Sequence, residues 1–199
     1  MKNKIIISFL LILMISKIGF SQENKIYLGN IICDSTSIQN EEKNVWRNHF
    51  SSIFESKNKI EIRIFIMRSK QYISLSYDSS WKLTKYKYNE QNEKYDVLKI
   101  TDSVKLDKIF KTLVNNNIFS LPDSQKVELG KYYYDLDLNE ISGAGIGYSH
   151  PFEDSIEFKV GEKYRCYSYY ETKEVSDFYP QNIEFKQFLN ILNCLNEID

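Results

Sequence analysis

His150 is the residue of this chain with the clearest setting for chemistry. It follows a glycine-rich segment and precedes Glu153 and Asp154. A histidine with carboxylates close by can act as a general base or bind a metal. A residue in a long surface loop is the simpler interpretation of the same pattern. His49, the other histidine, lies at the edge of an expected apolar helix face, where we expect it to pack.

Oxygen-bearing side chains occupy every second position at Asp135, Asp137 and Asn139, like the opening of a calcium-binding loop. The match then fails, because Glu140 stands where that loop needs glycine and Ile146 stands where it needs a bidentate acid. Aromatic and aliphatic residues alternate with the three oxygen donors, as in a strand with one solvated face. We therefore expect neither a metal nor a cofactor here.

The glycines of residues 142–147 suggest a phosphate loop, but residues 156–160 downstream alternate like a strand. Phosphate binding needs a helix N-terminus at that place, so a turn or a flexible loop is the better interpretation. The chain also lacks Gly-x-Ser-x-Gly and His-Glu-x-x-His motifs. A hydrolase or metal-dependent enzyme centred on His150, with Glu153, Asp135 and Asp137, is therefore an alternative hypothesis.

Tyrosine is the most conspicuous surplus, with 15 residues in the chain. Four of them, Tyr164, Tyr167, Tyr169 and Tyr170, crowd one expected strand. Tyrosine combines apolar area with a polar tip, which suits recognition of glycans or proteins. The leading hypothesis is thus a non-catalytic module that binds a protein or cell-envelope ligand through an aromatic sheet face. Tyrosines that pack at helix edges and sheet rims are the alternative.

The turn at Gly161-Glu162 fixes how these tyrosines are oriented. A two-residue type II′ turn with glycine first places Phe158 opposite Arg165. Tyr167 and Tyr169 then share the face of Phe158, and Tyr164 and Tyr170 lie on the other face. Lengthening or shortening this loop by one residue would shift the register and move each tyrosine to the other face of the sheet.

Residues 1–21 have the order of a secretory signal peptide: a basic start at Lys2 and Lys4, an apolar run, and small residues before Gln22. Removing this leader, which holds three lysines and no acid, changes the net charge from −1 to −4. This mildly acidic balance argues against nucleic acid as a partner. We expect an exported protein, periplasmic or secreted, with no membrane span after cleavage. The Phe-Ser-Gln end of the leader and the Asn-, Lys- and Ile-rich composition resemble uncharacterised exported proteins of Bacteroidota, a resemblance that implies no activity.

The remaining residues, 22–199, are enough for one domain with a substantial core. Cys33, Cys166 and Cys194 allow either one disulfide and a spare thiol or three buried thiols. Period-two alternation and turn residues predict strands at 25–34, 60–66, 73–77, 80–88, 94–100, 132–138, 154–160 and 163–170. Capping residues and apolar stripes predict helices at 40–57, 102–115 and 182–195.

These elements predict an α+β fold, an antiparallel sheet with about three helices packed on one face, in a single domain. The sequence leaves open a second non-catalytic role, an inhibitor or immunity-type protein that blocks a secreted enzyme. The ligand, the oligomeric state and the cysteine pairing are not determined at this level.

Overall fold

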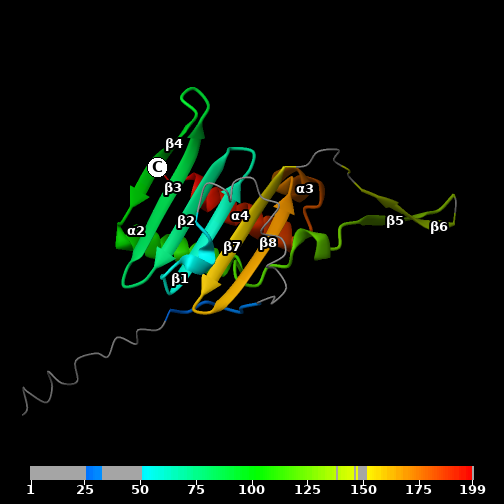
Figure 1. Cartoon of the computed structure of the whole chain (residues 1–199). Helices are drawn as coiled ribbons and strands as arrows, with labels where there is room; N and C mark the ends of the chain where they lie inside the picture. Colours follow the sequence, from blue (N-terminus) through cyan, green and yellow to red (C-terminus); the bar gives the residue numbers. More distant parts are fainter. Residues whose placement is uncertain (1–25, 33–50, 138, 146, 148–151, 199) are drawn as a thin grey trace, which may run out of the picture.

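The computed structural model describes residues 26–32, 51–137, 139–145, 147 and 152–198. It has a mixed α+β architecture whose main element is a six-stranded antiparallel sheet of order β4-β3-β2-β1-β7-β8 (Figure 1). The strands are β1 (Ile60–Ile66), β2 (Gln71–Tyr77), β3 (Trp81–Asn89), β4 (Lys94–Ile100), β7 (Glu153–Val160) and β8 (Lys163–Tyr170). The helices are α2 (Ser103–Asn115), α3 (Thr172–Phe178) and α4 (Ile183–Asn196), with short 3-10 helices η3 (Ile53–Glu55) and η4 (Ser124–Lys126).

Strand β1 is buried on both faces and lies in the middle of the sheet, between β2 and β7. Its isoleucines alternate onto the face that carries the hydrophobic core. The intervening Glu61, Arg63 and Phe65 are also buried, on the opposite face. The alternation therefore predicted the strand correctly but not the burial of its charged face.

The hairpin of β7 and β8 has the register that the turn predicted. Phe158 pairs with Arg165, and Glu157 pairs with Cys166. Gly161 has a φ of +58°, and Glu162 is not among the residues with positive φ. A positive φ at the first turn residue alone is the pattern of a type II′ turn, which glycine adopts without strain.

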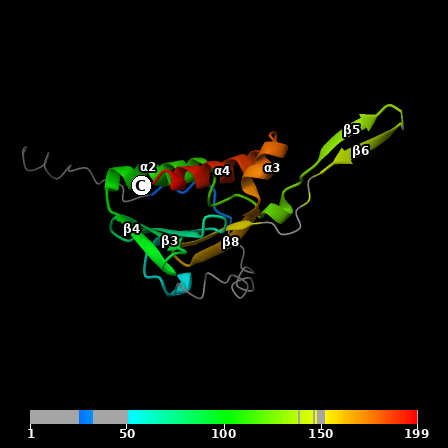
Figure 2. The same ribbon diagram turned by 90° about the horizontal axis from the view of Figure 1, so that it is seen from above.

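Two of the helices begin at the caps expected from the sequence. The Asp102 side chain accepts hydrogen bonds from the backbone N–H groups of Val104 and Lys105, and the Asn182 side chain accepts one from Phe185. Figure 2 shows α2 and α4 alongside the six-stranded sheet. Their buried side chains join the sheet isoleucines in one hydrophobic cluster. No helix within the described ranges is long and apolar enough to span a membrane.

Several parts of the chain differ from expectation. Residues 26–32 form no strand, and Ile32 instead donates its N–H to the Phe119 carbonyl at 2.9 Å. The helix expected over 40–57 lies partly outside the described residues, and its described end contains only η3. Helix α3 was not expected, because seven residues are too short for a clear helical period.

Strands β5 (Lys131–Asp135) and β6 (Glu140–Ala144) pair only with each other, in a separate two-stranded sheet. Figures 1 and 2 both show this hairpin extending away from the six-stranded sheet. Part of the segment expected to be a glycine loop is therefore strand, with Gly143 paired to Tyr132.

Candidate functional site

Two of the four candidate tyrosines on β8 are part of the hydrophobic core. Tyr167 and Tyr169 are buried on the face of the sheet that α4 covers. The Tyr167 hydroxyl donates a hydrogen bond to the Ile118 carbonyl at 2.6 Å. The Tyr169 ring stacks on Phe188, with centroids 4.3 Å apart. A ligand at the surface would not reach these two rings while the helices are in place.

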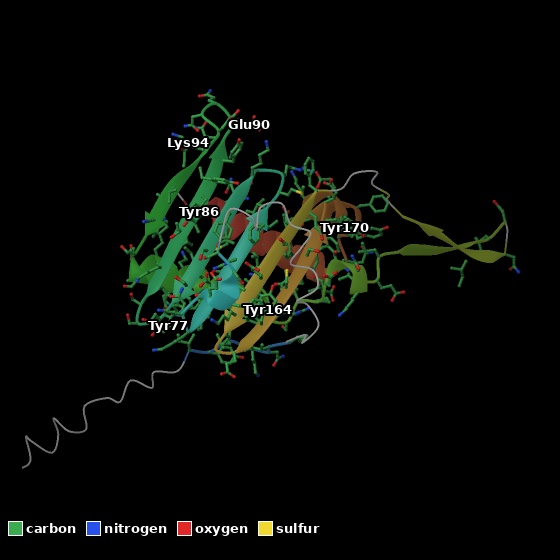
Figure 3. All side chains as sticks on the ribbon, in the orientation of Figure 1. Tyr77, Tyr86, Glu90, Lys94, Tyr164 and Tyr170 are labelled. Atoms are coloured by element: carbon green, nitrogen blue, oxygen red, sulfur yellow. The ribbon has the colours of Figure 1, made fainter. Side chains whose placement is uncertain are left out.

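The other two tyrosines lie at the two ends of β8, and Tyr164 is on the opposite face (Figure 3). Tyr164 is buried against Phe54, with ring centroids 4.5 Å apart, and its hydroxyl donates to Glu157 at 3.4 Å. Tyr170 is half-buried near Phe185. The four tyrosines therefore do not form one common surface.

The remaining candidates from the sequence are dispersed. His150 lies outside the described residues. Glu153 is exposed at the start of β7, where it accepts a hydrogen bond from the Ser168 hydroxyl. Asp135 ends β5, and Asp137 and Asn139 lie in and beside the turn that follows. Within the ranges that the structure describes, no group of three or more His, Cys, Asp and Glu side chains is placed to hold a metal ion.

Cys194 is a free thiol, and both it and Cys166 are half-buried. Burial raises the pKa of the Cys194 thiol, which favours its neutral, unreactive form. Cys33 lies outside the described residues.

A buried ionic cluster fixes the segment that precedes β1 to the sheet. Arg63 donates to Glu61 at 2.6 Å and to the Ser51 carbonyl at 2.6 Å, and it lies 3.4 Å from Glu157. Burial disfavours the charged form of Glu61, but hydrogen bonds from Ser56, Asn58 and Arg63 outweigh burial and lower its pKa. All three charged side chains are almost fully buried, so we interpret the cluster as structural.

A pocket of about 220 Å³ opens where the β1–β2 turn, the start of β7, the start of α3 and the end of α4 meet. Its lining combines apolar, acidic, basic and amide groups: Ile66, Arg68, Ser69, Phe152, Asp154, Glu171, Thr172, Lys173, Glu174, Leu189, Leu192, Asn193 and Asn196. Pockets with an apolar lining and a few convergent polar groups are the usual form of small-ligand sites. This pocket is the best candidate site of the described chain.

The side of the pocket formed by α3 and the turn is held by an ion-pair network. Arg68 donates to Glu171 at 2.5 Å and to Glu174 at 2.7 Å, and its guanidinium lies 5.2 Å from the centre of the Phe152 ring. Glu171 also accepts the Phe152 N–H at 3.0 Å. Glu171 has a φ of +42°, an unusual conformation for a residue with a side chain. These contacts position the Phe152 ring, of which 45% remains exposed, at the edge of the pocket.

Asp154 provides a buried carboxyl group in this pocket. Burial raises its pKa from 3.8 to about 6, although the Met67 N–H hydrogen bond and the charge of Arg68 act in the other direction. The Thr172 hydroxyl also lowers this pKa, so it lies near the carboxyl group. Yet the Thr172 Oγ1 atom is buried without a hydrogen bond of regular geometry.

The opposite side of the pocket is formed by the last two turns of α4. Asn193 and Asn196 are exposed there, and their spacing of three residues places both amides on one helix face. Asn190, one turn earlier, lies outside the pocket and bonds to Asn116 at 3.1 Å. The pair Asn193 and Asn196 on one helix face is a sequence signal for the site that was missed.

Comparisons of the chain with protein-family models, curated proteins and solved structures find no match in any of the three.

Proposed function

We propose that this chain is an exported, non-catalytic binding module whose ligand is a glycan of the cell envelope. The leader-like residues 1–21 support export. In this proposal residues 22–199 form a single domain in which all three helices pack on one face of the sheet. The pocket then lies at one end of that packing, between the β1–β2 turn and α4.

One observation carries the proposal: amide groups, an aromatic ring and aliphatic side chains line the same pocket. Asn193 and Asn196 offer donors and acceptors suited to sugar hydroxyls. The Phe152 ring offers a face for the C–H side of a sugar ring, and Leu192 adds apolar surface to the lining of the pocket. The volume of about 220 Å³ is suited to one sugar unit.

The test is binding of the purified full chain to an array of hexose, N-acetylhexosamine and uronic-acid oligosaccharides, followed by calorimetry on each glycan bound. We expect Asn193→Ala and Asn196→Ala each to weaken binding about three- to tenfold, since each removes one or two hydrogen bonds. Asn190→Ala is the matched control, because it changes the same residue type on the same helix outside the pocket. Equal losses from all three variants, or no glycan bound, would contradict the proposal. A stoichiometric protein complex in place of glycan binding would favour the inhibitor hypothesis.

A second candidate function, hydrolysis of the same glycan, is favoured by the state of the two buried acids. Asp154 has a pKa of about 6, and Glu171 is ion-paired with Arg68. Two carboxyl groups with different environments are the pattern of a glycosidase acid and its charged partner. Incubating the bound glycan with the wild-type chain and with Asp154→Asn tests this function. Release of new reducing ends by the wild type alone would support hydrolysis.

A further inference from the structure

A second groove, of about 610 Å³, adjoins the pocket over β3, β4 and the end of α4. It is lined by Ser69, Gln71, Lys85, Lys87, Asp96, Val97, Leu98, Asn196 and Ile198. Ser69 and Asn196 line both hollows. The pocket and the groove are therefore neighbouring parts of one cleft, and a ligand longer than one unit can pass from the first to the second.

The charge of the cleft changes along its length. The pocket holds Asp154, Glu171 and Glu174 against Arg68 and Lys173. Among the described residues, the groove instead holds two lysines, Lys85 and Lys87, against one acid, Asp96.

The two lysines of the groove differ in their surroundings. Lys85 is held in place, because its ammonium group donates to the Ile198 carbonyl at 3.0 Å. Lys87 is exposed, and Asp96 is its cross-strand neighbour. The Asp96 carboxylate in turn accepts a hydrogen bond from Asn89 at 3.2 Å. Lys87 is thus the exposed cation of the groove.

Two buried polar atoms near the shared wall have no hydrogen-bond partner among the described residues. They are the Ser69 hydroxyl oxygen and the Gln71 side-chain carbonyl oxygen. Each costs free energy in the unbound chain. A hydroxylated ligand that passes Ser69 on its way from the pocket to the groove can form hydrogen bonds with these two oxygen atoms after a small side-chain rotation.

We infer that the cleft binds an acidic glycan chain, with a neutral sugar unit in the pocket and a carboxylate-bearing unit beside Lys87. This inference rests on the proposed function and adds to it the charge and the minimum length of the ligand. The acids of the pocket outnumber its cations by three to two, which disfavours an anionic unit there, and the lysines of the groove outnumber its acid by two to one, which favours one. The ligand must therefore contain both kinds of unit.

The test uses the tetrasaccharide of alternating N-acetylglucosamine and glucuronic acid, and the same tetrasaccharide with its carboxyl groups methyl-esterified. Calorimetry on the full chain should show the acid binding about fivefold more tightly than the ester at low ionic strength. The difference should shrink as salt is added, because the interaction is electrostatic. Lys87→Gln should abolish the difference between acid and ester, because glutamine keeps a hydrogen-bond donor but carries no charge.

Lys82→Gln is the matched control, because Lys82 is an exposed lysine of the same strand that lines neither part of the cleft. Equal affinities for acid and ester, or an equal effect of both lysine variants, would overturn the inference. Asn196→Ala would in that case still weaken binding of both tetrasaccharides if the proposed function holds. Failure of both tetrasaccharides and of the whole array to bind would overturn the proposed function as well.

Discussion

Asp154 accepts a hydrogen bond from the backbone N–H of Met67 at 3.0 Å and so ties the start of β7 to the turn after β1. The same carboxyl group lies in the candidate pocket and has a pKa of about 6 because it is buried. The stability of the sheet therefore depends on whether this carboxyl group in the pocket is protonated.

The stability of the chain should depend on pH through Asp154. Because the folded-state pKa is raised from 3.8 to about 6, the folded chain binds more protons than the unfolded chain between these values. The contribution of Asp154 to stability is thus most favourable below pH 4 and is lost as the pH rises to 6, by at most about 3 kcal/mol. Asp154→Asn keeps an acceptor for Met67 but cannot ionise, so it should be more stable than the wild type above pH 6. Urea unfolding at several pH values checks this, and parallel curves for the two proteins would contradict it.

Tyr167 and Tyr169 should respond differently to loss of their hydroxyl groups. Tyr167→Phe leaves the Ile118 carbonyl without the 2.6 Å hydrogen bond and should lower the free energy of unfolding by about 1–2 kcal/mol. The Tyr169 hydroxyl is buried with no hydrogen-bond partner in the described chain. Tyr169→Phe should therefore be neutral or stabilising. Thermal and urea unfolding of the pair measure both effects, and equal losses would show that the hydrogen bond has no special role.

Replacement of Arg63 should strongly destabilise the sheet. Arg63→Met leaves Glu61 and Glu157 buried without their cation and should lower the free energy of unfolding by about 3–5 kcal/mol. Lys111→Met is the control, because the Lys111–Asp107 pair is exposed and should contribute less than about 0.5 kcal/mol. Urea unfolding compares the two variants. A loss below 1 kcal/mol for Arg63→Met would contradict a structural role for the cluster.

The β7–β8 turn should tolerate change at its second residue better than at its first. Gly161 has a φ of +58°, so Gly161→Ala should lower the free energy of unfolding by about 1–2 kcal/mol through backbone strain. Space is not the reason, since no heavy atom lies within 4 Å of an added Cβ. Glu162→Ala, at an exposed position, should change the free energy of unfolding by less than about 0.5 kcal/mol. Similar losses for the two variants in urea unfolding would refute the strain argument.

Local rules predicted most elements because these elements depend on neighbouring residues. The alternation over residues 60–66 predicted β1, and the capping side chains of Asp102 and Asn182 predicted the starts of α2 and α4. The two-residue turn at Gly161 predicted the register of β8, including which tyrosines share a face. Each of these inferences needs only a period, a cap or a turn, all of which act over a few residues.

Only the tertiary structure decided which face became core and where a pocket formed. The sequence placed Tyr167 and Tyr169 together but did not reveal that α4 would bury them. The ion pair of Arg68 with Glu174 joins residues 106 positions apart, and no local pattern encodes such a contact. The pocket, the raised pKa of Asp154 and the burial of the Arg63 cluster arise from packing between distant segments. For this reason the sequence by itself determined the strands of the six-stranded sheet, two of the helices and one register, and the candidate site emerged only from the way they pack.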